Sequence, residues 1–147
     1  MTGGEGVAVD LLASEQLTLE EMAAYLGVST AEVQRREQAG ELFSFFRERR
    51  GSERLYPFYQ LAPEVYPSLI QRTRAAFDPD LVQVHYFFTR RDPDLGRLSV
   101  RELLAGRPHE SFELDSVGEW LLSLPFARRL DAALAALERE RNHCQAC

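Results

Sequence analysis

The chain has 147 residues, of which 45% are hydrophobic and 27% charged, a composition typical of one globular domain or two small modules. Its apolar runs are far shorter than the roughly 18 residues of a membrane-spanning helix. The first ten residues contain no Lys or Arg, unlike a secretion signal. The composition therefore excludes wholesale disorder, and we expect a protein without membrane spans. Cys144 and Cys147 are too close together in the sequence for a disulfide between them to stabilise the fold. The lack of stabilising disulfides favours a cytoplasmic location.

The net charge of −6 at first argues against a nucleic-acid partner, because phosphate contacts require positive charge. The charges are segregated along the chain, however. Residues 1–34 hold six acidic residues and no basic one, whereas residues 35–107 hold 13 Arg and ten acidic residues. All 17 basic residues are Arg, which suits bidentate recognition of phosphate or guanine. A GC-rich genome produces the same bias, and we give that explanation more weight.

A loose arm is expected over residues 1–16, in which a short apolar cluster at residues 7–12 could alternatively dock as a helical turn, and a short helix follows. Thr18 and Glu21 have the spacing of a capping box, in which each side chain accepts a hydrogen bond from the other residue's backbone N–H. This spacing predicts a helix over residues 19–26, with Gly27 ending it.

A second short helix is expected directly afterwards. Ser29 and Glu32 repeat the capping box, and the helix should stop at Gly40. Two short helices joined by a turn with a glycine predict a helix-turn-helix. Its small residue, turn glycine and apolar plug would be Ala23, Gly27 and Val33. The alternative is a plain helical hairpin within a bundle.

A β-hairpin is expected next. Residues 42–46 and 55–61 have the aromatic and apolar content of strands, and the charged residues 47–54 between them favour a turn. Such a wing would carry four Arg near its tip, where they could straddle a DNA backbone. Two Glu reduce that surplus, so a solvated charged loop is an equally good interpretation. Pro57 has no N–H to donate, so its strand should be an edge strand or irregular.

The chain beyond residue 63 is expected to be helical. Pro67 suits the first position of a helix whose inward residues would be Leu69, Ile70, Thr73 and Ala76. Asp78 and Pro79 suit the N-cap and first position of the next helix. Residues 81–88 alternate as in a strand but also fit one helical face, and the Asp-Pro start favours a helix.

Three further helices are expected. Ser99 and Glu102 form a third capping box before a short helix that ends at Gly106, and Asp115 could cap another helix. Pro125 separates that helix from the last one. The last helix has an apolar stripe of Phe126, Leu130, Leu134 and Leu137. Its residues expected to face water are Arg128, Arg129, Glu138 and Arg141.

Two family resemblances follow from these motifs. Residues 17–61, through the runs at 17–29 and 40–42, resemble the helix-turn-helix and wing of MerR and excisionase-type DNA-binding proteins. Residues 57–106 resemble the Xre/MbcA/ParS toxin-binding antitoxin domain. The features behind the second resemblance are a Pro-x-Leu, a Gly-Arg pair, a capped Leu-Leu helix and a closing glycine, found at Pro93, Leu95, Gly96, Arg97, Ser99, Leu103, Leu104 and Gly106. This resemblance implies a partner toxin with an NAD-consuming RES domain, which the antitoxin masks.

The sequence departs from the family pattern at three places. Ser99-Val100 stands where the family has Thr-Pro, and Arg91-Asp92 stands where it has Asn near its proline. The capping logic survives, because Ser caps a helix as well as Thr does. Residues 108–147 have no counterpart in the resemblance.

The expected fold class is mainly α, with an N-terminal winged helix-turn-helix and small β-hairpin at residues 17–61. A helical toxin-binding domain with a C-terminal tail would occupy residues 62–147. In the second helix, Gln34 suits adenine, Arg35 suits guanine and Arg36 suits phosphate. The DNA-binding candidates are Ser29, Thr30, Gln34, Arg35, Arg36, Arg47, Arg49, Arg50 and Arg54. The toxin-binding candidates are Arg97, Arg101, Leu103, Leu104, Phe126 and Leu130.

Catalysis has little support in the sequence, and we expect neither an enzyme nor a cofactor. His85 fits a packing residue and His109 a loop, and no nucleophile or phosphate-loop motif is present. The one ligand-like cluster is His143, Cys144 and Cys147, which lacks the spaced pairs of a structural zinc site, so no metal is expected.

The predicted function is an antitoxin that masks a RES-like toxin and represses its own operon by binding operator DNA. It would act as a homodimer or in a larger complex with the toxin. The alternative is a stand-alone regulator without a toxin partner.

Overall fold

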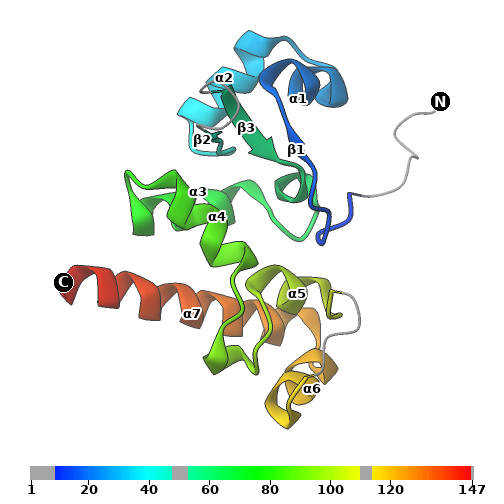
Figure 1. Cartoon of the computed structure of the whole chain (residues 1–147), viewed down its shortest axis with the longest axis vertical. Helices are drawn as coiled ribbons and strands as arrows, with labels where there is room; N and C mark the ends of the chain where they lie inside the picture. Colours follow the sequence, from blue (N-terminus) through cyan, green and yellow to red (C-terminus); the bar gives the residue numbers. More distant parts are fainter. Residues whose placement is uncertain (1–8, 48–52, 110–113, 147) are drawn as a thin grey trace. The chain divides into compact units, whose positions relative to one another are not determined.

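A computed structural model of the chain describes residues 9–47, 53–109 and 114–146. The described part is mainly helical, as the sequence predicts, and contains a small three-stranded antiparallel sheet where the sequence predicts a two-stranded hairpin (Figure 1). The chain divides into two compact units, Met1–Ile70 and Gln71–Cys147. Within the described ranges no helix is long and apolar enough to span a bilayer.

The first unit contains the two short helices that were expected, α1 (Leu19–Leu26) and α2 (Thr30–Gln38). Both bonds of the first capping box are present: the Thr18 hydroxyl accepts from the Glu21 N–H, and the Glu21 carboxylate accepts from the Thr18 N–H at 2.8 Å. Gly27 ends α1 in the left-handed region, at φ 70°. These predictions are confirmed, because caps depend on residues only a few positions apart.

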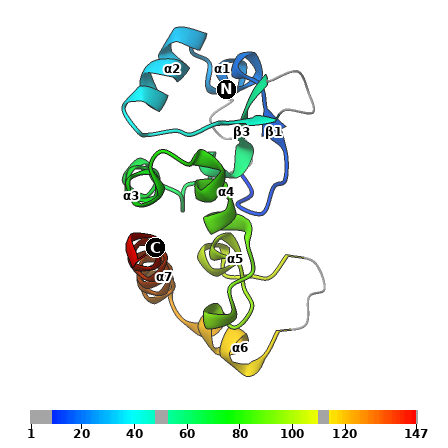
Figure 2. The same ribbon diagram turned by 60° about the vertical axis from the view of Figure 1, so that its left-hand side comes forward.

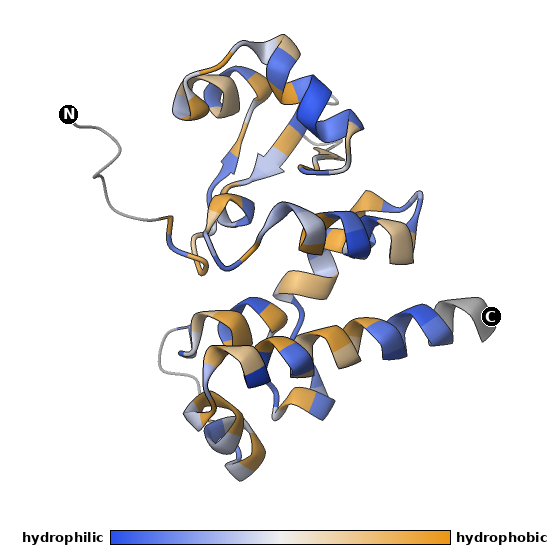
Figure 3. Ribbon diagram, turned by 180° about the vertical axis from the view of Figure 1, so that it is seen from behind, coloured by the Kyte–Doolittle hydropathy of each residue, from blue (hydrophilic) through white to orange (hydrophobic). Residues whose placement is uncertain are grey.

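A small core holds α1 and α2 against the sheet. It consists of Met22, Ala23, Val33, Leu42 and Tyr56, each almost fully buried. Val33 is the single fully buried residue of α2, so this helix has one inward apolar position and leaves most of its surface in water. Figure 3 shows the result as a mostly hydrophilic α2.

The sheet consists of β1 (Gln16–Leu17), β2 (Phe45–Arg47) and β3 (Glu53–Pro57), in the order β1-β3-β2. Of the two alternatives for the strand with Pro57, an edge position does not hold for β3 as a whole, which is central, but at Pro57 itself β3 is paired on one side only. Pairing with β2 covers the first half of β3 and stops at Leu55, while Pro57 pairs with Gln16 on the other side. The missing N–H of Pro57 therefore falls beyond the β2 ladder.

The second predicted strand ends earlier than expected, because Phe58–Leu61 is a 3-10 helix, η3. The first one begins later, at Phe45 rather than at residue 42. At this position a side chain makes the backbone hydrogen bonds that a neighbouring strand would otherwise make. The buried Gln60 amide accepts from the N–H of Phe43 and donates to its carbonyl oxygen, both at 2.9 Å.

The expectation of a loose arm through residue 16 is wrong for the described residues 9–16. Leu11 and Leu12 are only 2% and 4% exposed, and Gln16 lies in β1. The carbonyl oxygen of Glu15 also accepts a hydrogen bond from the N–H of Phe58 at 2.9 Å. The apolar pair and the strand together hold this segment in the first unit; residues 1–8 lie outside the described part.

The remaining helices are α3 (Pro67–Phe77), α4 (Leu81–Thr89), α5 (Val100–Ala105), α6 (Ser116–Ser123) and α7 (Phe126–Ala146), with a short 3-10 turn, η4 (Pro93–Leu95). The division between the units falls within α3. The N-caps predicted at Ser99 and Asp115 are confirmed. The one predicted at Asp78 is wrong. Asp80 caps α4 instead, accepting from the N–H groups of Val82 and Gln83.

The core of the second unit includes residues of α4, α5 and α7. In this unit α5 and α7 pack together (Figure 2). Fully buried side chains include Val84, Phe88, Leu98, Leu103 and Leu104. The apolar stripe predicted on α7 is correct at Leu137. Its deepest other residues are Ala133 and Ala136, while Phe126, Leu130 and Leu134 are half-buried.

Candidate functional site

The outer surface of α2 is the candidate site of the first unit. Ser29 caps the helix by accepting a hydrogen bond from the N–H of Glu32 at 3.0 Å. Thr30, Gln34 and Arg35 are exposed, and Val33 lies inward between them in the sequence. The structure thus places three polar side chains on a helix that is anchored through its opposite side.

Glu32 binds two arginines, which the sequence did not predict. Its carboxylate was expected to complete a second capping box. Instead, Oε1 accepts from Nε of Arg35 at 2.8 Å, and Oε2 accepts from Nη2 of Arg35 and Nε of Arg36, each at 2.9 Å. The i,i+3 and i,i+4 spacings put these side chains on one face of α2. The carboxylate binds the arginines because a charged guanidinium is a stronger hydrogen-bond donor than a neutral backbone N–H.

These two arginines change the ionisation of Glu32. The hydrogen bonds from Arg35, and then the one from Arg36, lower the pKa of Glu32 to about 2. The carboxylate therefore stays ionised at any physiological pH, and the three side chains together carry one net positive charge. The positive surface that the sequence attributes to α2 is correspondingly smaller than its arginines alone suggest.

A second group of contacts ties α2 to the sheet. The Glu37 carboxylate accepts from the Ser44 hydroxyl at 2.5 Å and from the Tyr56 hydroxyl at 2.6 Å. Arg54 donates to Ser44 at 3.0 Å and lies 4.2 Å from the ring centroid of Phe46. Burial, and then the bond to Glu37, raises the pKa of Tyr56, so its hydroxyl stays protonated as a donor. These bonds hold Arg54 on the hairpin beside α2.

The predicted DNA-binding residues fall into two described groups. Ser29, Thr30, Gln34, Arg35 and Arg36 share α2, and Arg54 lies on β3. The backbone of Arg47 pairs with Glu53 at the end of β2, but its side chain lies outside the description. Arg49 and Arg50 also fall outside the described residues. The structure therefore bears only on the helix and on the base of the hairpin.

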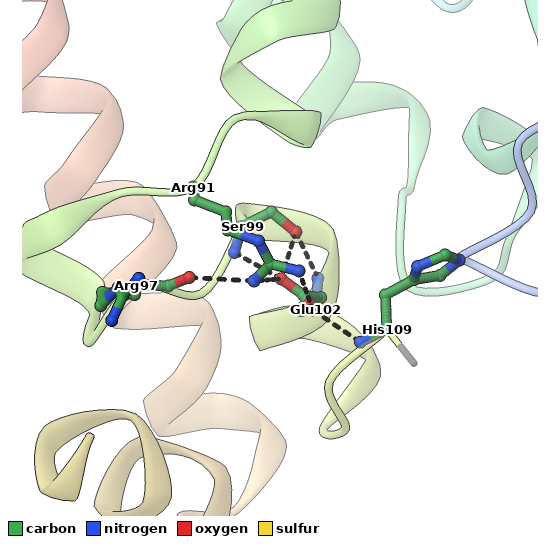
Figure 4. Close-up of polar contacts among 5 residues, drawn as sticks. All are labelled: Arg91, Arg97, Ser99, Glu102 and His109. Atoms are coloured by element: carbon green, nitrogen blue, oxygen red, sulfur yellow. Dashed lines mark hydrogen bonds and ion pairs between the residues drawn. The ribbon is translucent and has the colours of Figure 1, made fainter. Parts of the chain in front are cut away.

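The second unit contains a buried carboxylate network around Glu102 (Figure 4). Glu102 is only 1% exposed, although its side chain is a carboxyl group. Its Oε1 accepts from the Ser99 N–H at 2.8 Å and from Nη1 of Arg91 at 3.0 Å, and its Oε2 accepts from the His109 N–H at 2.6 Å. Arg91 also donates to the carbonyl oxygen of Arg97 at 3.0 Å. The network joins the start of α5 to the segments on both sides of it.

Burial alone would raise the pKa of Glu102. The hydrogen bonds from His109 and Ser99, and the charge of Arg91, outweigh burial and leave this pKa below its usual value. The capping box predicted the bond to Ser99, but no sequence signal pointed to Arg91 or to the His109 backbone. We interpret the network as structural, because the carboxylate is almost fully buried and is held by donors of Ser99, Arg91 and His109.

The toxin-binding candidates are not all on the surface. Leu103 and Leu104 are 0% and 1% exposed, so the expectation that they contact a partner is wrong: they are core residues of the second unit. Arg97 is exposed, with a left-handed backbone at φ 69°, and Arg101 is half-buried. Phe126 and Leu130 are also half-buried, on α7.

Two exposed apolar residues on α6 were missed by the sequence analysis. Trp120 is 60% exposed and Val117 is 48% exposed, three positions apart on one helical face. The signal was available, because Trp is rarely left so open in a stable domain and is enriched at interfaces. This Trp120–Val117 patch is one of two exposed apolar pairs on described helices of the second unit, and its residues are a candidate for protein contact; the other pair is Val82 and Tyr86 on α4.

Among residues 9–47, 53–109 and 114–146, no group of three or more His, Cys, Asp or Glu side chains is placed to hold a metal ion. The side chains of His143 and Cys144, and all of Cys147, lie outside the described part. Comparison of the chain with protein-family models, with curated proteins and with solved structures found no match.

Proposed function

We propose that the chain is an antitoxin-type regulator whose first unit binds operator DNA as a winged helix-turn-helix, with α2 in the major groove. The observation that carries this proposal is the placement of α2. Val33 and Ala23 share one buried cluster across the left-handed turn at Gly27, so that Thr30, Gln34 and Arg35 remain open to a groove.

The hairpin supports the same orientation. Strands β2 and β3 follow α2 in the chain, and Arg54 on β3 is linked to Glu37 of α2 through Ser44. A wing tied to the reading helix can contact the phosphate backbone beside the groove that the helix occupies. Since phosphate contacts depend on local charge, an acidic chain can still bind DNA through such a patch, above all as a dimer.

The second unit is proposed to mask a RES-domain toxin. The resemblance of residues 57–106 implies this class of partner. The described surface supports a protein contact at the Trp120–Val117 patch, because a well-exposed Trp is a typical anchor of an interface. This patch lies in the part of the chain that the resemblance does not cover. It replaces Leu103 and Leu104 as the expected contact.

DNA binding is tested by fluorescence anisotropy, with a labelled duplex from upstream of the chain's own coding sequence and with a random duplex. Arg35→Ala should weaken binding to the upstream duplex by about 1–3 kcal/mol and affect random DNA less. Arg128→Ala, which removes an exposed arginine from α7, is the charge-matched control and should change neither. Equal losses of Arg35→Ala on both duplexes would contradict a reading role for α2.

The toxin partner is tested by co-expression with the product of the adjacent reading frame, followed by copurification. A toxic RES-like product that is tolerated with this chain, and that copurifies with it, supports the antitoxin function. Trp120→Ala should reduce copurification. Tyr86→Ala, an aromatic residue on α4 that is 52% exposed, is the matched control and should not. Protection by the wild-type chain without complex formation would contradict direct masking.

A stand-alone regulator is the second candidate. The burial of Leu103 and Leu104 favours it, because the second unit completes its own core without a partner. In that case the wild-type chain binds the upstream duplex with a steep salt dependence, yet protects cells from no neighbouring product.

A further inference from the structure

The contact between Glu32 and Arg35 has a geometry that bears on how α2 would read a base. Glu32 engages the side-on edge of the guanidinium, through Nε at 2.8 Å and Nη2 at 2.9 Å. A guanidinium has five N–H groups, and this contact occupies one on Nε and one on Nη2. The end-on edge, formed by Nη1 and the second hydrogen of Nη2, is left for another acceptor pair.

That end-on edge is suited to guanine. Two parallel N–H donors match the O6 and N7 acceptors that guanine presents in the major groove. The Arg35 side chain is 61% exposed in spite of its ion pair, so its outer edge is open to a ligand. Glu32 itself is held from a second side by Nε of Arg36 at 2.9 Å. The carboxylate is thus fixed by two cations and can orient Arg35.

The negative charge of Glu32 adds a second effect. A carboxylate next to the DNA backbone weakens the attraction of Arg35 and Arg36 to every phosphate, whatever the sequence. Orientation of Arg35 helps only where guanine stands at the matching position. The orientation of Arg35 therefore raises the ratio of specific to non-specific binding, whereas the negative charge lowers the affinity for both.

We infer that Glu32 is a specificity-determining positioning residue, which holds Arg35 in the orientation that reads a guanine in the operator. This inference rests on the proposed DNA-binding function of α2. It adds an acidic residue to a site that the sequence analysis described only through arginines and polar side chains.

The test is a selection of duplexes from a random pool by the wild-type chain and by Glu32→Gln. Gln keeps the length of the side chain and removes its charge. We expect the wild-type chain to enrich a guanine at one position, and Glu32→Gln to lose most of that enrichment. The ratio of the Kd for the random duplex to the Kd for the enriched duplex should fall about tenfold. A factor of this size is what the loss of one well-oriented base contact costs. Affinity for the random duplex should rise, with a salt slope steeper by about one.

Two controls make the result specific. Glu119→Gln removes an exposed carboxylate from α6, with the same change in net charge, and should leave the enrichment unchanged. Replacing the enriched guanine by 7-deazaguanine removes N7. It should weaken the wild-type complex strongly and the Glu32→Gln complex little. Circular dichroism of each variant checks that α2 is retained.

The outcomes separate the two proposals. If the wild-type chain enriches no duplex, the proposed DNA-binding function fails, and this inference fails with it. If the wild-type chain enriches a guanine and Glu32→Gln retains it with an unchanged Kd ratio, DNA binding stands and the positioning role of Glu32 is wrong. If enrichment and the effect of 7-deazaguanine both fall in Glu32→Gln, the inference is supported.

Discussion

Arg129 of α7 caps the C-terminal end of α5. Its Nη1 donates a hydrogen bond to the carbonyl oxygen of Leu103 at 2.9 Å. The same nitrogen donates to the carbonyl oxygen of Leu104 at 3.1 Å. A cation at this end of a helix also meets the negative end of the helix dipole. Arg129 was expected to face water; it is half-buried and joins two helices of the second unit.

Arg129→Ala should therefore destabilise the second unit. Its removal leaves carbonyl oxygens of the last turn of α5 without this donor, and we expect a loss of about 1–3 kcal/mol in the free energy of unfolding. Urea unfolding followed by circular dichroism measures the loss. Arg128→Ala, the exposed neighbour in the sequence, should change the free energy by less than about 0.5 kcal/mol. Similar losses for the two variants would show that the cap does not contribute.

Gly96 and Gly27 make a matched pair for a second prediction. Both have left-handed backbones, at φ 62° and φ 70°. A Cβ on Gly96 would lie 2.2 Å from the backbone N of Gly118, whereas a Cβ on Gly27 meets nothing within 4 Å. Gly27→Ala should cost only the backbone strain, about 1–2 kcal/mol. Gly96→Ala should cost about 3 kcal/mol or more, because η4 and α6 must also separate. Thermal unfolding of both variants compares them, and equal losses would contradict the close approach.

Local and distant contacts differ in how far the sequence predicts them. The caps at Thr18, Ser99 and Asp115 were predicted correctly, because each pairs with a residue three positions away. The hydrogen bonds between the Gln60 side chain and the Phe43 backbone join residues 17 positions apart, and the bond from Arg129 to Leu103 joins residues 26 positions apart. Such partners depend on the folded arrangement, which periodicity and spacing do not contain.

The candidate site shows the same limit within one helix. The exposure of Thr30 and Gln34 follows from the helical period around Val33, and it agrees with their prediction as DNA-binding candidates. The hydrogen-bond partners of the Glu32 carboxylate were not predicted. Its carboxylate had a local backbone donor and two arginines within reach, and the stronger charged donors bind it. Sequence spacing gives both possibilities and does not rank them.

The ionisation of Glu102 predicts a pH dependence of stability. Its pKa is lower in the folded chain than in the unfolded chain, so its contribution is complete above about pH 5 and is lost as the pH falls through the folded value. Glu102→Gln removes this titration. The variant should be less stable at pH 7, by about 1–3 kcal/mol, and its stability should fall less steeply between about pH 5 and 3.

Urea unfolding at several pH values measures both effects in wild type and variant. Glu119→Gln removes an exposed carboxylate and should have the same slope as the wild type. Parallel slopes for the wild type and Glu102→Gln would show that the Glu102 network does not favour the ionised form.

The last prediction separates core from contact surface in the second unit. Leu104→Ala removes a side chain that is 1% exposed, and such a cavity costs about 2–5 kcal/mol. Trp120→Ala removes a larger side chain that is 60% exposed, so it should cost less than about 1 kcal/mol. The order is opposite to that of side-chain size, because burial decides the free energy. Urea unfolding of the free chain gives both values. A loss for Trp120→Ala as large as that for Leu104→Ala would place Trp120 in the core and remove the proposed contact patch.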